Sequence, residues 1–224
     1  MNWRVVAAAV FPLLLVSATV RAEEPGRGLT AAFEQEYLKS IMDHHFSALR
    51  MTELAAGTDV TRDPAISPEE GTSPTPEETA TEPKATLEML RSLARANNRV
   101  QREEILAAQG FLRDWYGIEY EPRLRQSGKR AIEALEKAAA GDQFNVKFME
   151  VVSRHHFIAA EDSLACVVAV ELEHHELERY CQRIIGAQVS DIQDMREWLC
   201  RFYEICDYQP LSGIAGRHQT GQEP

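Results

Sequence analysis

Glycine and proline are scarce in this sequence, with 12 and 10 residues in a chain of 224. A many-stranded barrel or sandwich needs turn residues about every 8–12 positions, so this scarcity argues against both. The chain also lacks a sustained alternation of apolar and polar residues, a phosphate-binding glycine loop and a nucleophile elbow. What remains is helical periodicity, and the fold class that we predict is all-α.

Basic residues are few relative to acidic ones: 24 lysines and arginines face 35 aspartates and glutamates, which gives a net charge of −11 and a pI near 5.2. Such a surface repels phosphate backbones, which argues against a nucleic-acid partner, while it is compatible with cations. The apolar content of 44% is sufficient for a buried core.

Only one long apolar run occurs, at the start of the chain, where residues 5–20 follow Arg4. A basic start, an apolar stretch and small residues before the acidic pair Glu23-Glu24 are typical of a secretory signal cleaved after Ala22. The run falls short of the ~20 residues that span a bilayer, which argues against a retained anchor. We predict a secreted or periplasmic protein with no membrane segment after cleavage.

Cysteine is limited to four residues, all in the last third of the chain. None stands in a C-x-x-C spacing, and export favours structural disulfides. Cys166 and Cys181 are nearly equidistant from a turn expected near residue 173 and should lie close together. Cys200 and Cys206 can pair only if their helix ends between them.

Apolar residues recur at steps of three and four in four long segments, and a short helix is expected at 129–140. The four long helices are predicted at 30–56, 87–116, 144–170 and 174–205. A single soluble helix of ~60 residues would need coiled-coil heptads, which the sequence does not show. We therefore predict a break between the last two long helices near 171–173.

The segment 57–86 holds half of the prolines of the chain among threonines and glutamates, and we interpret it as an acidic, mobile loop. The organisation that follows is a signal peptide at 1–22, a first helical hairpin at 30–122, a second at 129–207 and a flexible tail at 211–224.

Two sets of residues recur at fixed offsets, which predicts a duplication. Phe33, His44 and His45 recur 111 positions later as Phe144, His155 and His156, and Gln101, Glu104 and Ile105 recur 87 positions later as Gln188, Asp191 and Ile192. The two offsets differ by 24 residues, which the loop accommodates. We predict a ferritin-like four-helix bundle built from two duplicated hairpins.

These residues carry a family resemblance. His44-His45 with Ala48 and Met51, the last-helix pattern from Ile184 to Leu199, and His174-His175-Glu176-Leu177 resemble the ferritin-like bacterial family called domain of unknown function three hundred and five. The resemblance implies a helical bundle, extracytoplasmic placement and, in some members, copper binding or copper tolerance, without enzyme activity. The chain departs from the family pattern at Asp162 and Ala108, so each repeat keeps one of two thioethers.

Stacking the two hairpins would bring nitrogen and oxygen ligands together midway along the bundle. The predicted layer consists of His44, Gln101, Glu104, His155, Gln188 and Asp191. Two imidazoles and two carboxylates suit Cu(II), zinc, iron or manganese better than Cu(I). We therefore predict a bound transition metal (copper, zinc or iron), held for sequestration or resistance, with Met51 and Met195 as further candidate ligands. His45 and His156 point ~100° away from their neighbours and are expected on a flank.

Alternatives to this site remain open at the level of sequence. His174, in the acidic turn 171–176, is a candidate surface ligand. Glu171-x-x-His174 has the spacing of di-iron bundles, but no second copy exists, which argues against an oxidase. A metal-free network of histidine–carboxylate hydrogen bonds would satisfy the same residues. The protein would then be a structural or interaction module of the cell envelope, with a second copy or another envelope protein as partner.

Overall fold

A computed structural model describes residues 29–58, 75, 78–168 and 171–211 of the chain. The predicted signal peptide, most of the proline-rich loop and nearly all of the tail lie outside these residues. Every regular element in the described part is a helix, which confirms the all-α prediction. The helices are α1 (Leu29–Ala56), α2 (Glu88–Tyr116), α3 (Gln126–Lys137), α4 (Asp142–Val168) and α5 (His175–Tyr203).

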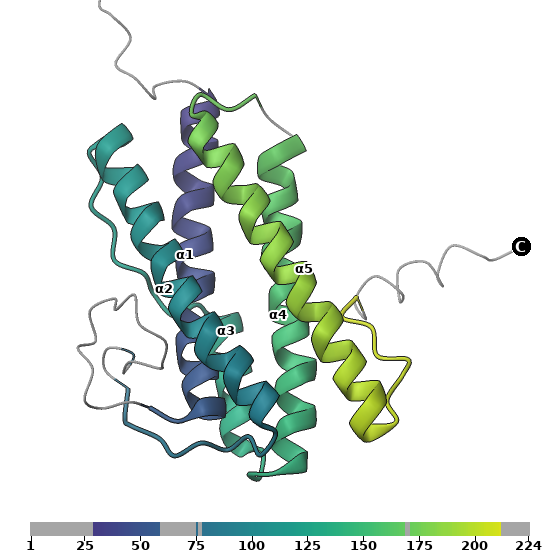
Figure 1. Cartoon of the computed structure of the whole chain (residues 1–224). Coiled ribbons are helices and arrows are strands. Elements are labelled where there is room, and N and C mark those ends of the chain that lie inside the picture. The colour runs from purple at the N-terminus through teal and green to yellow at the C-terminus, as the bar shows by residue number, and fades with distance from the viewer. Residues whose placement is uncertain (1–28, 59–74, 76–77, 169–170, 212–224) are drawn as a thin grey trace, which may run out of the picture.

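The four long helices form two hairpins that pack side by side (Figure 1). The first hairpin pairs α1 with α2, and the second pairs α4 with α5; α1 packs against α4 and joins them. The short helix α3 lies against both α1 and α4. A groove of about 410 Å³ runs between α2 and α5. Among the described helices, none is both long enough and apolar enough to cross a membrane.

Two apolar clusters fill the bundle, one toward each end. One contains Phe144, Phe148 and Leu199, and the other contains Tyr180 and Ile184. On α4 the first cluster ends at residue 152 and the second begins at 159, and on α5 the gap runs from 184 to 195. Between the two apolar cores, this gap holds the buried polar side chains of Ser153, His155, His156 and Gln188.

Both α2 and α5 end in a left-handed residue, at the same offset as the repeated sequence. Gly117 has φ 65°, and Glu204, 87 positions later, has φ 60°. In each case the following residue, Ile118 or Ile205, donates its backbone N–H back to a leucine carbonyl at 3.1 Å. This is the hydrogen-bond pattern of a Schellman-type helix end.

Because α5 ends at residue 203, Cys200 and Cys206 can approach closely enough to form a disulfide. Cys166 and Cys181 are bridged across the second hairpin, and Cys200 and Cys206 are bridged around the helix end. All four cysteines are therefore paired, as the sequence predicts if the helix ends between residues 200 and 206.

The described part of the proline-rich loop is packed on the bundle, unlike the mobile loop expected from sequence. The buried Arg50 donates to the carbonyl of Thr79 at 2.7 Å, and Thr75 donates to the buried Glu53. Lys84 donates its backbone N–H to the carbonyl of Leu54. Backbone and side-chain hydrogen bonds from α1 therefore fix this part of the loop.

Candidate metal centre

The layer between the two apolar cores contains two adjacent pairs of histidines. His44 and His45 lie on α1, and His155 and His156 lie on α4. His44 and His155 are in contact, and each is 6.0 Å from its own neighbour between ring centroids. Consecutive residues of a helix point ~100° apart. The first histidine of each pair, His44 or His155, therefore has different partners from the second, His45 or His156.

The first histidines face each other across the interface between the hairpins. Their rings stack with centroids 3.6 Å apart and planes inclined by 24°. His44 Nε2 lies 3.0 Å from the carbonyl oxygen of His155, and His155 Nε2 lies 3.2 Å from that of His44. A carbonyl can only accept, so each Nε2 carries the proton. The Nε2 atoms of His44 and His155 thus donate to backbone carbonyls. The carboxylates predicted as their neighbours, Glu104 and Asp191, pair with other histidines.

Ser47 completes this contact. Its hydroxyl donates to the carbonyl of His44 at 2.7 Å, and its Oγ lies 2.9 Å from His155 Nε2. Burial, followed by the neighbouring His45, lowers the pKa of His44 from 6.5 to about 3. Burial and the adjacent His44 lower the pKa of His155 well below 6.5. Both rings are therefore neutral at pH 7.

The second histidines meet the carboxylates within their own hairpins. His45 Nε2 lies 3.1 Å from Glu104 Oε2, and His156 Nε2 lies 3.2 Å from Asp191 Oδ2. Both imidazoles are completely buried. The sequence therefore identifies the carboxylates, but it assigns them to the wrong member of each histidine pair. His45 and His156 are at the centre of the hairpins, not on a flank.

The two pairs differ in their hydrogen bonding. His156 and Asp191 form a hydrogen bond, whereas His45 Nε2 and Glu104 Oε2 are buried without hydrogen-bond alignment to any described group. The side-chain oxygen of Gln101, three residues before Glu104 on the same face of α2, is also buried and has no hydrogen-bond partner among the described residues. A buried polar atom left in this state costs about 1–3 kcal/mol.

Imidazole nitrogens and carboxylate oxygens are suitable metal ligands, but few of them meet at any one position in the layer. Among the described residues, no three side chains from histidine, cysteine, aspartate and glutamate converge on one ion position. The first hairpin supplies one imidazole nitrogen, one carboxylate oxygen and, from Gln101, one amide oxygen. The corresponding amide oxygen of Gln188 in the second hairpin is also buried, and no described group bonds to it.

Met51 and Met195 belong to the apolar core. Both are completely buried in the cluster that also contains Phe144 and Leu199. Met195 accepts a hydrogen bond from the hydroxyl of Ser153, 3.8 Å from its sulfur. In the described part of the chain, neither sulfur makes a polar contact with the histidine–carboxylate pairs.

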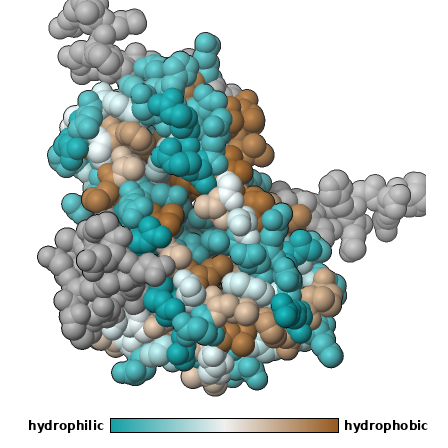
Figure 2. All heavy atoms as spheres, viewed as in Figure 1, coloured by the Kyte–Doolittle hydropathy of each residue, from teal (hydrophilic) through white to brown (hydrophobic). Residues whose placement is uncertain are grey.

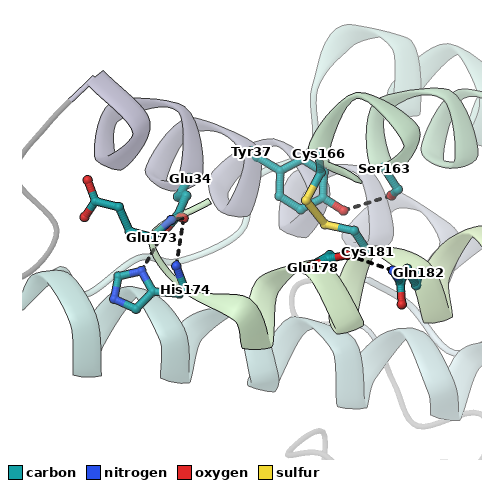
Figure 3. The surroundings of a disulfide bond; sticks show 9 residues. All are labelled: Glu34, Tyr37, Ser163, Cys166, Glu173, His174, Glu178, Cys181 and Gln182. Carbon is teal, nitrogen blue, oxygen red and sulfur yellow. Dashed lines mark hydrogen bonds and ion pairs between the residues drawn. A yellow bond between two sulfur atoms is a disulfide. The ribbon is translucent and has the colours of Figure 1, made fainter. Parts of the chain in front are cut away.

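His174 lies at the far end of the bundle, where it immediately precedes α5 (Figure 3). Its Nδ1 lies 2.6 Å from Oε2 of the completely buried Glu34 on α1. Glu34 Oε1 also accepts the backbone N–H groups of Glu173 and His174, at 2.8 and 3.2 Å. The ring stacks on Trp115, with centroids 4.0 Å apart. This arrangement fixes the turn between the hairpin helices to α1.

The groove between α2 and α5 gives the second pair a route to the surface. Asp191 and Asn97 contribute to its walls, with Trp198 and the exposed Met89 further along. Figure 2 shows this face of the molecule, where polar and apolar side chains alternate over the two helices. An ion could therefore reach Asp191 without separation of the hairpins.

Comparison with known proteins identifies the family. The family model described as "Domain of unknown function (DUF305)" matches residues 78–199, more than half of the chain. The chain belongs to the DUF305 family. The DUF305 match spans α2, α3, α4 and most of α5, so it contains Glu104, His156 and Asp191 but not His45 of α1. No curated protein matches the sequence.

Solved structures of CopM have a similar fold. CopM with silver bound is 20% identical, has a TM-score of 0.55 and is matched over 76% of this chain and 97% of CopM. The Cu(II)-bound form is 20% identical, with a TM-score of 0.54 and coverage of 74% and 94%. The Cu(I)-bound form is 21% identical, with a TM-score of 0.52 and coverage of 76% and 97%. This DUF305 chain and CopM thus share a helical fold.

Proposed function

We propose that this protein binds a transition metal, with copper as the favoured ion, for sequestration or resistance outside the cytoplasm. The observation that carries the proposal is the pair His45 Nε2 and Glu104 Oε2, both buried, 3.1 Å apart and without hydrogen-bond partners among the described residues. Two ligands at right angles on one metal, each ~2.0–2.1 Å from it, would be separated by about 3 Å. The spacing of this pair is therefore suited to chelation.

The second hairpin offers an equivalent pair in His156 and Asp191. These positions follow His45 and Glu104 by the same two offsets that relate the repeated sequences, which supports a duplicated unit with two related half-sites. Gln101 and Gln188 would supply the neighbouring amide oxygens. When bound, the metal would supply charge compensation for the carboxylates; no catalytic step is assigned to it.

Copper is favoured by the donor set together with the fold relatives. Imidazole and carboxylate ligands suit Cu(II), zinc and iron, whereas Cu(I) prefers thioethers and thiolates. Met51 and Met195 are in the core, and all four cysteines are in disulfides. The CopM structures of similar fold contain silver, Cu(II) and Cu(I). This chain's own ligands therefore favour Cu(II).

Export is supported by the disulfides as well as by the predicted signal sequence. Two disulfides and no free cysteine are typical of proteins from oxidising compartments. We propose cleavage after Ala22 and a periplasmic or secreted location.

A titration of the metal-stripped chain lacking residues 1–22 tests the proposal. Cu(II), Zn(II) and Fe(II) are added in separate experiments, with calorimetry for affinity and electron paramagnetic resonance for nitrogen ligation of Cu(II). The double variant His45→Gln/His156→Gln should lose at least about tenfold in Cu(II) affinity, since even outer-shell changes have effects of ~10–100-fold. The exposed His175→Gln is the matched control.

A second double variant, His44→Gln/His155→Gln, separates the two kinds of histidine. It should retain Cu(II) binding, provided that circular dichroism shows a folded protein. Unchanged binding in His45→Gln/His156→Gln would overturn the proposed centre. Absence of binding in the parent would favour the alternative, a metal-free structural module in which the buried pairs only orient the helices.

A further inference from the structure

A cavity of about 480 Å³ lies between α1, α3 and α4, apart from the proposed metal ligands. Helix α3 approaches α1 closely at Gly128, where a Cβ would lie only 2.6 Å from the Cβ of Ser47. Further along α3, the side chains that face the cavity, Ala131 and Ala134, are small. A close contact at one end and small side chains beyond it leave the space unfilled.

The walls of this cavity are mainly apolar. Ala131 and Ala134 face Val151 and Ile158 of α4, and the stacked rings of His44 and His155 close the cavity on the side of the metal layer. The volume is in the range of about 300–1,000 Å³ that is usual for small-molecule sites, which combine apolar walls with a few polar groups.

Two of the carboxylates around the cavity already have partners. Asp43 accepts from the hydroxyl of Tyr120, from the backbone of Arg123 and from Arg125 at 2.9 Å. Glu150 pairs with Lys147 at 2.8 Å. Neither carboxylate has to be neutralised by a ligand.

Two arginines around the cavity have no carboxylate partner in the described part of the chain. Arg130 extends from α3 and forms no ion pair there, and Arg154 extends from α4. The contacts of Arg154 are the carbonyl of Pro210, at 2.7 Å, and the ring of Phe157. The remaining lining carboxylate, Asp162, forms no ion pair with any described residue; it lies eight residues along α4 from Arg154, or ~12 Å at the rise of a helix. Arg130 and Arg154 are therefore the lining cations that remain available to an anionic ligand.

We propose that this cavity binds a small amphipathic carboxylate. Its head group would pair with Arg130 and Arg154, and its apolar body would lie along Ala131, Ala134 and Ile158. Guanidinium groups hold carboxylates through paired, charge-assisted hydrogen bonds. A net charge of −11 disfavours anions elsewhere on the surface, so local arginines are needed to hold one. This proposal does not depend on metal binding.

Calorimetric titration of the full, metal-free, disulfide-bonded chain with three ten-carbon probes tests the assignment. Decanoate should bind at least about tenfold more tightly than decanol or decyltrimethylammonium, since a charge-assisted contact to each arginine is available only to the anion. Arg130→Gln/Arg154→Gln should remove this preference while decanol binding stays unchanged. Lys137→Gln, an exposed cation of the same helix, should leave decanoate binding unchanged.

Two further variants keep the test decisive if the double variant does not fold. Arg130→Gln alone removes an exposed side chain that has no ion-pair partner in the described part of the chain, and it should weaken decanoate binding several-fold. Ala134→Leu fills the cavity and should weaken all three probes. Decanoate binding that is equal in all variants would overturn the proposal. A preference for decyltrimethylammonium would also overturn it, and would instead implicate Asp162.

Discussion

His44 and His155 join the two hairpins by stacking their rings 3.6 Å apart and by pointing each Nε2 at the other's backbone carbonyl. Four polar groups of two helices are satisfied reciprocally in this contact. The pair lies where α1 meets α4, and Ser47 and Gly128 allow α3 to pack beside it. The contact therefore sets the relative position of three helices.

Burial of these rings predicts a loss of stability at acidic pH. The pKa of His44 is about 3 in the folded chain because of burial and the nearby His45, compared with 6.5 when exposed. Between these values the unfolded state binds more protons, so stability is fully present above pH 6.5 and declines as the pH falls toward 3. His44 alone should contribute about 1.4 kcal/mol per pH unit in that range.

Urea unfolding at pH 7.5 and pH 4.5, with a chelator present, measures this effect. The variant His44→Gln/His155→Gln should show a smaller difference between the two pH values than the parent. His175→Gln, which changes an exposed histidine, should preserve the full difference. An equal difference in all three proteins would assign the acid sensitivity to other groups.

Gly128→Ala should destabilise the protein although alanine is the better helix former. The new Cβ would lie 2.6 Å from Ser47 Cβ, and overpacking of this kind costs about 1–3 kcal/mol. Gly186→Ala is a matched control in α5, because its Cβ would have no atom within 4 Å. It should stabilise by roughly 0.5–1 kcal/mol through helix propensity.

A thermodynamic cycle separates the steric effect at Gly128 from other causes. In a Ser47→Gly background, Gly128→Ala should cost less than in the parent, since the clashing Cβ is gone. Chemical denaturation gives the four free energies of unfolding. If the cost is the same in both backgrounds, the close approach of α3 to α1 at this point is not what limits residue 128.

The helices follow closely from the sequence because their periodicity is local. The expected segments 87–116 and 174–205 correspond to α2 at Glu88–Tyr116 and α5 at His175–Tyr203. The repeated offsets also identify Glu104 and Asp191 as the carboxylates of the layer. Periodicity and repetition are properties of the chain itself, and they require no knowledge of how helices pack.

The partner of each histidine could not be predicted in the same way. Adjacent residues differ by ~100° around the helix, so the choice between His44 and His45 depends on how α1 is rotated against α2 and α4. Tertiary packing determines this rotation. One signal was present: His45 continues the apolar spacing of Leu38 and Ile41, which places it on a buried stripe. Glu34 begins the same stripe, and its burial could have been inferred from that position.

Replacement of Glu34 should loosen the connection between the hairpin helices. Glu34 accepts two backbone N–H groups and contacts His174 Nδ1 at 2.6 Å (Figure 3). Glu34→Ala leaves these donors without their buried acceptor, with an expected cost of about 1–3 kcal/mol for each donor that water does not reach. Glu36→Ala, on the same helix turn but without these contacts, should change stability by less than about 0.5 kcal/mol.

Hydrogen exchange locates the effect of Glu34→Ala. The amides of Glu173 and His174 should exchange faster, while those near Cys200 should not change. Uniform acceleration across the chain would indicate global destabilisation instead of a local loosening of this turn.

The two disulfides should differ in their contribution to stability because they close loops of different length. Cys166 and Cys181 are 15 residues apart, whereas Cys200 and Cys206 are six apart. A 15-residue loop corresponds to about 3 kcal/mol of unfolded-state entropy, and a shorter loop to less. Both cysteines of the first bridge are completely buried, so the variants should be Cys166→Ala/Cys181→Ala and Cys200→Ala/Cys206→Ala, which introduce no buried hydroxyl.

Guanidinium unfolding of the two double variants at pH 7 measures the difference. The first should lose more free energy of unfolding than the second, in which the left-handed Glu204 and its backbone hydrogen bonds still end α5. A larger loss in Cys200→Ala/Cys206→Ala would mean that this bridge, and not the backbone pattern, holds residues 204–210 against the second hairpin. Tyr208 and Pro210, which bond to Glu150 and Arg154, would then be released together with it.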